Sequence, residues 1–305
     1  SVLTGSHRVA DISQHAVDLG ADELVLLDAD ALLPEILRFR PPAGLHVTGL
    51  VTRDPRLEWS GRWVHRIRMA GKGALILSSN RLQRRVRIVM LGSPYGRTNT
   101  MPRWLASLQL ADEAIDPVVF DPAKGSVEHF RATHLAGGRT WFGICGYLDP
   151  RKRIDLALAA LSHLDCSNYG LLLAGTVHAG LRDELERQAQ PLVDRGLRIE
   201  WIDRHLSNAE MSTAIAAVDA SLVLYTTPNP PSSLGKALSA GTLTILAGPD
   251  ALRGYAGRFP SSAWQCEDEP HAIASLMSRV NPGQRVATHD FPDASEFAKA
   301  VLVPT

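Results

Sequence analysis

The chain has 305 residues, 45% of them hydrophobic and 21% charged, and this length and composition are typical of two globular domains. Lysine plus arginine and aspartate plus glutamate both number 32, so no net charge favours a nucleic acid or an anionic membrane as partner. A local basic patch remains compatible with this balance.

The cysteines and the apolar runs indicate the compartment. Cys145, Cys166 and Cys266 are odd in number, far apart and without metal-ligand spacing, which predicts free thiols in a reducing environment. No basic-then-apolar leader opens the sequence, and no apolar run approaches the roughly 20 residues that span a bilayer. We therefore expect a cytoplasmic protein that is at most peripherally attached to a membrane.

The first part of the chain alternates between helical and strand patterns. Helices are predicted over 9–19, 31–39 and 57–70, and strands over 23–28, 45–51, 74–78, 85–91 and 117–120. The series begins on a helix and has no opening strand with a Gly-rich turn, so we expect an abbreviated N-terminal domain, or one whose first β-α-β unit lies outside this chain. The segment Pro122–Ser126 is the best linker, which predicts domains at 1–125 and 126–305.

From Thr140 onward the alternation is clearer. Apolar strands are predicted over 140–148, 170–176, 197–203, 220–226 and 242–248, with helices between them over 154–164, 181–196, 209–218 and 232–240. Strands that are apolar on both faces and alternate with amphipathic helices are typical of a parallel sheet covered on both sides, as in a doubly wound domain.

The segment 229–242 leaves one of these strands through two prolines and two serines. As a structural feature, Ser232 or Ser233 would cap a short helix, and Gly241 would supply the left-handed residue that ends it. As a functional feature, a strand, a Ser/Gly turn and a helix N-terminus form a ready site for a phosphate. Both interpretations stay open on these residues alone.

Three motifs in order carry a resemblance to a known family. They are the turn from Gly146 to Lys152 before a helix, the alternating elements over 171–225, and the segment from Lys236 to Ile245. Residues 140–250 resemble the nucleotide-binding domain of GT-B glycosyltransferases, particularly the retaining family 4 type. The resemblance implies an α/β fold with two Rossmann-like doubly wound domains facing a cleft. It also implies transfer of a sugar from a nucleotide diphosphate sugar to a carbohydrate, lipid or natural-product acceptor, without an obligatory metal.

The same resemblance implies a donor site. Gly146 and Lys152 would lie at the diphosphate, and a lysine just beyond a strand end is independently suited to a phosphate, although it could equally be a solvated side chain. Ser232, Ser233 and Gly235 would present hydroxyl and N–H groups to the distal phosphate or the sugar. Lys236 would either add a phosphate contact or cover the helix surface.

Several positions depart from the family pattern. The two glutamates expected eight positions apart fall on Pro228 and Lys236, and the arginine that accompanies the lysine is Tyr147. Losing a carboxylate to the ribose diol weakens nucleotide binding by about 10 to 100-fold. No catalytic histidine is identifiable, since His46 and His65 do not fit the expected position. A non-catalytic binding or scaffold protein that partners an active transferase is therefore the alternative function.

Two other features have alternative interpretations. Asp28 and Asp30 follow a strand, and could hold a divalent metal as in GT-A enzymes or cap the next helix. The loop over 91–99, with Arg97, could face the interdomain cleft or be an ordinary turn. No hydrolase, zinc or Walker motif occurs in the sequence.

Overall fold

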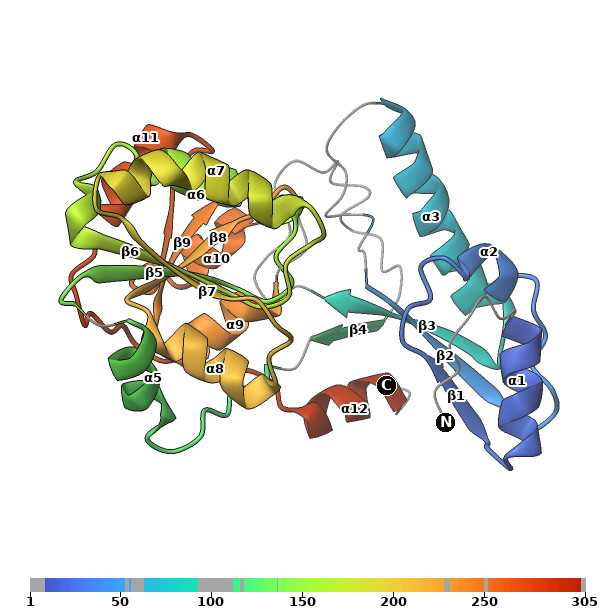
Figure 1. Ribbon diagram of the computed structural model, residues 1–305. Coiled ribbons are helices and arrows are strands. Elements are labelled where there is room, and N and C mark those ends of the chain that lie inside the picture. Colours follow the sequence, from blue (N-terminus) through green and yellow to red (C-terminus); the bar gives the residue numbers. More distant parts are fainter. Residues whose placement is uncertain are drawn as a thin grey trace. The chain divides into compact units, whose positions relative to one another are not determined.

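The protein has an α/β fold, seen in a computed structural model that describes residues 9–52, 55, 63–92, 112–115, 118–135, 137–227, 231–249 and 252–302 (Figure 1). Two compact units are present, one formed by Ser1–Pro117 with Pro292–Thr305 and the other by Val118–Phe291. The first division thus follows Pro117, whereas the predicted boundary follows residue 125, and the chain returns to the first unit at its end.

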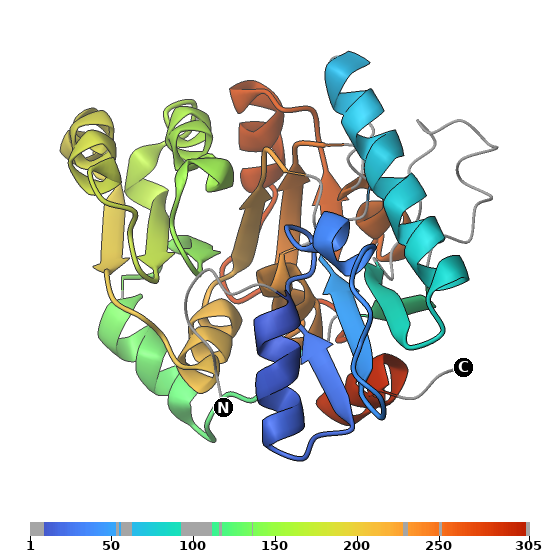
Figure 2. The ribbon, with the colours of Figure 1, turned by 90° about the vertical axis from the view of Figure 1, so that its right-hand side faces the viewer.

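The first unit is a parallel sheet in the order β1-β2-β3-β4, formed by Glu23–Leu26, His46–Val51, Val86–Gly92 and Asp112–Ile115. Helices α1 (Val9–Asp18), α2 (Leu33–Ile36) and α3 (Trp63–Leu82) cover one face, and α12 (Ala294–Leu302) covers the other (Figures 1 and 2). The alternation along the strands explains this arrangement, since Val47 and Ile88 pack with the first three helices while Leu50 and Val89 pack with Val301.

Two strands predicted in the first part of the chain are wrong. Residues 74–78 belong to α3, where Met69 and Ile76 are buried seven positions apart, on one helical face. Residues 118–120 form no strand, and the sheet instead gains β4 at Asp112–Ile115. Short apolar runs cannot be assigned to helix or strand by periodicity alone.

The second unit contains a parallel sheet in the order β10-β9-β8-β5-β6-β7. The five strands predicted from Thr140 onward are confirmed as β5 (Thr140–Cys145), β6 (Tyr169–Ala174), β7 (Arg198–Ile202), β8 (Ala220–Leu224) and β9 (Leu243–Ala247), and β10 (Ala263–Gln265) is added at the edge. Numbered along the chain, these strands have the 3-2-1-4-5-6 order of a Rossmann fold.

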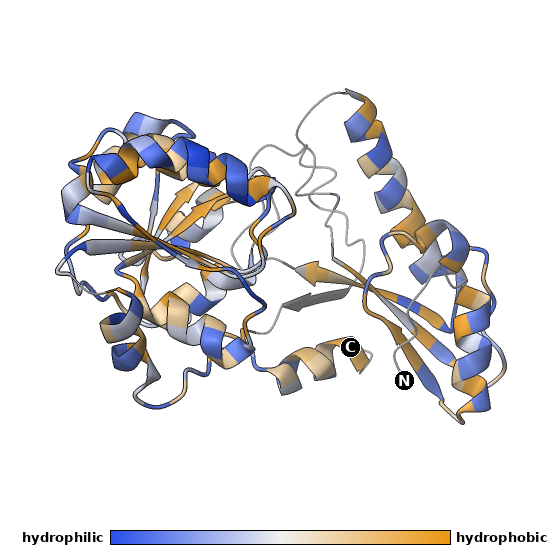
Figure 3. Ribbon diagram, viewed as in Figure 1, coloured by the Kyte–Doolittle hydropathy of each residue, from blue (hydrophilic) through white to orange (hydrophobic). Residues whose placement is uncertain are grey.

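Helices cover both faces of this sheet, as the apolar strands predict. Figure 1 shows α6 (Ile154–Leu161), α7 (Leu181–Asp194) and α11 (Pro270–Met277) on one side, and α5 (Ser126–His134), α8 (Asn208–Ala217) and α9 (Ser232–Ser239) on the other. A short α10 (Arg253–Arg258) precedes β10. The central strands β5, β8 and β9 are buried throughout, and the hydropathy colouring shows β8 and β9 as hydrophobic arrows (Figure 3).

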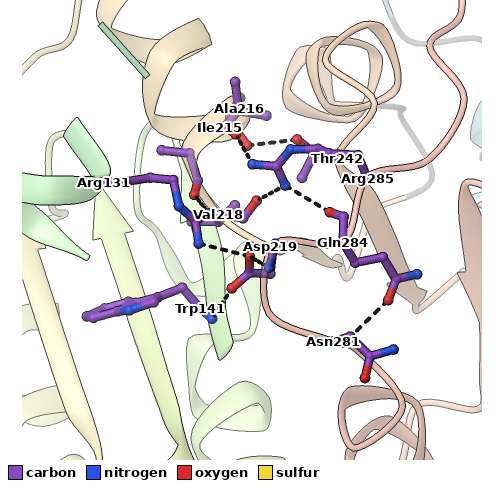
Figure 4. Close-up of polar contacts among 12 residues, drawn as sticks. Arg131, Trp141, Ile215, Ala216, Val218, Asp219, Thr242, Asn281, Gln284 and Arg285 are labelled. Carbon is purple, nitrogen blue, oxygen red and sulfur yellow. Dashed lines mark hydrogen bonds and ion pairs between the residues drawn. The ribbon is translucent and has the colours of Figure 1, made fainter. Parts of the chain in front are cut away.

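A buried carboxylate joins several elements of the second unit (Figure 4). Asp219 is fully buried and accepts hydrogen bonds from the backbone N–H groups of Trp141 and Gly283, both at 2.7 Å, and from Arg131 Nη2 at 3.1 Å. Arg285 donates to the carbonyls of Val218 at 2.9 Å and Ala216 at 2.7 Å. The carbonyls at the end of α8 thus receive N–H groups from arginines, which satisfies acceptors that a helix leaves free at its C-terminus.

Among the described helices, none combines the length and the hydrophobicity that a membrane span requires.

Candidate functional site

The strand order of the second unit reverses between β5 and β8. These two strands pair through Phe142↔Ala220 and Gly143↔Ser221, while β6 continues the sheet on one side and β9 on the other. In open parallel sheets, ligands bind outside the carboxyl ends of the strands at such a switch point, where the two following loops diverge. The loop after β5 carries Gly146 and Lys152, so two of the predicted site residues lie at this position.

Gly146 shapes the start of that loop. Its φ of 100° lies in the region that favours glycine, and a Cβ atom at this residue would lie 3.2 Å from Lys152 Nζ. The missing side chain therefore leaves the space that the lysine ammonium group occupies. Sequence reasoning placed Gly146 and Lys152 at one site, and the structure brings them into contact.

Lys152 ends a 3-10 turn, Pro150–Lys152, with only 7% of the residue exposed. Its Nζ donates to the Cys145 carbonyl at 2.5 Å and lies 5.3 Å from the centre of the Tyr225 ring. Tyr225 follows β8, so this cation-π contact joins the two loops of the switch point. An ammonium group has three donors, and two remain after the bond to Cys145.

The neighbouring arginines have acidic partners, unlike Lys152. Asp149 accepts from the Arg151 backbone N–H at 2.9 Å and pairs with Arg151 Nη2 at 2.6 Å, while Arg153 pairs with Asp268 at 2.9 Å. The hydrogen bond to Asp149 raises the pKa of Arg151. Within the described part of the chain, Lys152 has no carboxylate partner and is the uncompensated cation of this loop.

The loop is also held to β8 by its backbone. The backbone N–H of Thr226 donates to the Arg151 carbonyl at 3.0 Å, one residue before Lys152. Behind the lysine, burial raises the pKa of the Cys145 thiol to about 12, even though the Lys152 charge acts in the opposite direction. Cys145 is thus an apolar wall of the site.

The predicted serine cap of α9 is wrong. The N-cap residue is Pro231, in an extended conformation and without a side-chain cap bond, and Ser232 and Ser233 are the first two helical residues. Neither hydroxyl is used by the helix, and Ser232 is exposed. Backbone N–H groups of a first helical turn lack helical acceptors, so the start of α9 retains donors for an anion. Gly241, with a φ of 65°, ends the segment in the left-handed conformation, as predicted.

Gly235 and Lys236 pack against another segment. A Cβ atom at Gly235 would lie 2.5 Å from Val118 Cγ2, and Lys236 Nζ donates to the Val119 carbonyl. Burial lowers the pKa of Lys236. These packing contacts account for a glycine at 235 and a lysine at 236 without a ligand. A phosphate contact by either residue stays a prediction.

The remaining candidates are distributed over the chain. Tyr147 is 51% exposed, with its ring edge-on to His178 at 6.4 Å. His46 begins β2, and His65 is half-buried on α3. Most of the predicted loop over 91–99, Arg97 included, lies outside the described residues, as does Pro228.

Asp30 is engaged within the first unit. It accepts from the Thr52 backbone N–H at 2.8 Å and the Thr52 hydroxyl at 2.9 Å, and it pairs with Lys72. Burial raises its pKa, but these hydrogen bonds and the Lys72 charge outweigh that effect and hold the pKa below its ordinary value. The capping prediction is wrong, because the N-cap of α2 is Leu32. In the described residues, no three acidic, histidine or cysteine side chains gather as metal ligands.

Solved structures with a similar fold were found, whereas no protein-family model and no curated protein matches the sequence. Sucrose-phosphate synthase from Thermosynechococcus elongatus aligns with a TM-score of 0.63 and 14% identity, over 89% of this chain and 67% of that chain. Anabaena HepE in complex with UDP and glucose aligns with a TM-score of 0.62 and 16% identity, over 88% of this chain and 70% of that chain. An α,α-trehalose-phosphate synthase (UDP-forming) from Burkholderia xenovorans, in complex with glucose 6-phosphate, aligns with a TM-score of 0.60 and 13% identity. This alignment covers 95% of this chain and 72% of that chain.

The chain has the GT-B fold. The expectation from residues 140–250 is thereby confirmed at the level of fold. In this GT-B chain, Asp149 and Tyr225 belong to the switch point but were not predicted as site residues. Asp149 had a usable signal, since an aspartate directly before a proline is a common start of a helical turn. Tyr225 had none beyond its position at the end of an apolar strand.

Proposed function

We propose that this GT-B protein is a glycosyltransferase that moves a sugar from a nucleotide diphosphate sugar to a carbohydrate, lipid or natural-product acceptor. The observation that carries the proposal is Lys152, a nearly buried ammonium group without a carboxylate partner at the switch point of the second unit. Ligands with negative charge are the expected partners of such a group. The UDP and glucose bound to Anabaena HepE support this donor class.

The proposed mechanism is electrostatic. As the sugar leaves, charge grows on the departing diphosphate, and positively charged or N–H groups fixed in advance at that position lower the barrier. In this chain the Lys152 ammonium group would supply the charge, and the start of α9, with Ser232 and Ser233, would supply N–H donors. Because these groups neutralise phosphate charge themselves, the mechanism does not need a metal ion.

A non-catalytic binding or scaffold role is the second candidate. It is favoured by Tyr147 at the arginine position and by Lys236 at a glutamate position, where the amine instead donates to the Val119 carbonyl. A scaffold of this kind would bind a protein partner and would not turn over a donor.

Calorimetric titration of the full chain with UDP, GDP, ADP and their sugar conjugates tests the proposal. We expect one nucleotide to bind in the micromolar range, and Lys152→Met, which keeps the buried stem, to weaken it by about 10 to 100-fold. Lys124→Met, at an exposed lysine of the same unit, is the matched control and should bind like the wild type. If no nucleotide binds at millimolar concentration, or if Lys152→Met binds normally, the donor site is refuted. Binding without donor turnover would favour the scaffold.

A cytoplasmic location with peripheral membrane contact is proposed as well. The first turns of α3 expose Trp63 by 72%, Val64 by 58% and Ile67 by 61%, beside Arg66 and Arg68. Apolar and basic side chains together on one helix surface are typical of interfacial helices. Co-sedimentation with anionic vesicles should fall for Trp63→Ser with Ile67→Ser, and should not change for Leu19→Ser, another exposed apolar residue.

A further inference from the structure

A cavity of about 560 Å³ in the first unit is lined by four arginines and by no acidic residue. The arginines are Arg38, Arg40, Arg84 and Arg85, and Leu37 and Gln83 complete most of the wall. All of them are described residues of one unit. Because the whole chain carries equal numbers of basic and acidic residues, this concentration of one charge is local.

The cavity lies at the amino edge of the first sheet. Arg38 and Arg40 precede β2, and Arg84 and Arg85 precede β3, which runs parallel to β2. Ligands of doubly wound sheets bind at the opposite edge, outside the carboxyl ends of the strands. The cavity is therefore separate from the edge where a substrate of this unit would be expected, and it belongs to a different unit from Lys152.

Hydrogen bonds hold the two arginine-bearing loops together. Gln83 Nε2 donates to the carbonyls of Ile36 at 3.0 Å and Leu37 at 2.5 Å, which joins the end of α2 to the end of α3. Arg85 Nη1 donates to the Pro42 carbonyl at 3.3 Å. The backbone N–H of Val47 also donates to the Arg85 carbonyl, at 2.9 Å. The cavity is thus preformed in the absence of a ligand.

Structural roles do not account for all four charges. Basic residues near helix C-termini often bond to free carbonyls, but Gln83 fills that role for α2. Among the described residues, Arg85 is the one arginine of the four whose guanidinium bonds to a carbonyl. Arg38, Arg40 and Arg84 have no ion pair within the described residues, and the nearby Glu35 accepts instead from the Val9 backbone N–H at 2.7 Å. Like charges gathered in one cavity repel each other, so they favour an anionic ligand between them.

We propose that this cavity is a binding site for a phosphorylated ligand with at least two negative charges. Guanidinium groups match phosphate oxygens in a bidentate geometry, keep their charge at every physiological pH and make stronger hydrogen bonds than neutral donors. Four of them exceed what a single carboxylate would need. The site goes beyond the proposed sugar transfer and does not depend on it.

The test uses inorganic pyrophosphate as probe, titrated calorimetrically into the full chain at low ionic strength. All variants carry Lys152→Met, so that a second phosphate site in the other unit does not contribute. The site variant is Arg38→Gln with Arg84→Gln, both at exposed positions. The control is Arg81→Gln with Arg187→Gln, which removes the same charge from two exposed arginines outside the cavity.

We expect pyrophosphate binding that weakens with added salt, persists in the control and weakens at least about tenfold in the site variant. Vesicles that contain phosphatidic acid form the second arm. Vesicle binding that depends on the same two arginines, with weak pyrophosphate binding, would identify a lipid headgroup as the source of the phosphate. The proposal is overturned if neither probe binds, or if both double variants lose binding equally. Titration with UDP reports separately on the proposed donor site.

Discussion

Two hydrogen bonds join Asp219 and Trp141. The backbone of Trp141 takes part in both, whereas Asp219 uses its carboxylate in one and its backbone N–H in the other. The Trp141 N–H donates to the Asp219 carboxylate at 2.7 Å, and the Asp219 N–H donates to the Trp141 carbonyl at 2.8 Å. This pair extends the short contact between β5 and β8, the two strands at the switch point. Its position links the stability of the sheet to the geometry of the loops that hold Lys152.

Asp219→Ala should therefore destabilise the protein strongly. It leaves the N–H groups of Trp141 and Gly283 and the Nη2 group of Arg131 without this acceptor, and each buried donor left unsatisfied costs about 1 to 3 kcal/mol. Urea denaturation measures the change in the free energy of unfolding. Asp290→Ala, at an exposed aspartate, is the control and should change it by less than about 0.5 kcal/mol. An effect below about 1 kcal/mol for Asp219→Ala would contradict the role of this carboxylate.

Gly170→Ala should also destabilise the second unit. A Cβ atom at Gly170 would lie 2.6 Å from ring atoms of Trp141, which is fully buried and cannot move aside, and overpacking of this kind costs about 1 to 3 kcal/mol. Gly71→Ala is the matched control. No atom lies within 4 Å of a Cβ there, and alanine in the α3 interior should add about 0.5 to 1 kcal/mol. Thermal unfolding of both variants would show shifts of opposite sign.

The N-terminus of α8 should contribute stability that disappears in acid. Ser207 and Glu210 form a capping box, and hydrogen bonds from Arg204 and from Ser207 lower the pKa of Glu210 to about 2. A lowered folded pKa means that the contribution is present above the ordinary value of 4.5 and is lost as the pH falls toward 2. The difference in denaturant midpoint between wild type and Glu210→Gln should shrink over this range. A difference that does not vary with pH would argue against the lowered pKa of Glu210.

Lys236 should give a dependence of the same sign at alkaline pH, since its pKa is lowered as well. Burial lowers its pKa from 10.5, so its charged form is disfavoured in the folded protein, and stability should rise as the pH passes through the folded pKa toward 10.5. Lys236→Met lacks the titrating group. We expect the free energy of unfolding of the wild type, measured in urea, to increase relative to that of the variant as the pH rises from 7 to 10. A constant difference would show that the amine is solvated.

The sequence patterns were most informative where burial is most complete. β5, β8 and β9 are buried along their whole length, which produces the uninterrupted apolar runs that identified them. In the first unit, the run over 74–78 is equally apolar but lies inside a helix, because its buried residues recur at helical spacing with Met69. A five-residue run does not contain enough of the period to decide between these structures.

The candidate site was predictable only in its local parts. Lys152 follows a strand directly, so its place at the carboxyl edge could be inferred, as could the left-handed Gly241. Asp219 and Tyr225 could not be assigned, since their partners lie far away in sequence, such as Arg131 at 88 residues from Asp219. The serine cap failed because Pro231, with its extended backbone, already occupies the N-cap position.

The last helix has a consequence for synthesis on the ribosome. α12 belongs to the first unit, where Val301 packs with Leu50 and Val89, and Arg87 donates to the carbonyls of Val301 at 3.0 Å and Ala300 at 3.1 Å. The unit whose strands emerge first is therefore completed only when residues 294–302 have left the exit tunnel. During translation of the intervening residues, one apolar face of β2 and β3 is not yet packed against α12. The second unit has its last strand at Ala263–Gln265 and ends at Phe291, before α12 begins, so it can fold before the first unit is closed.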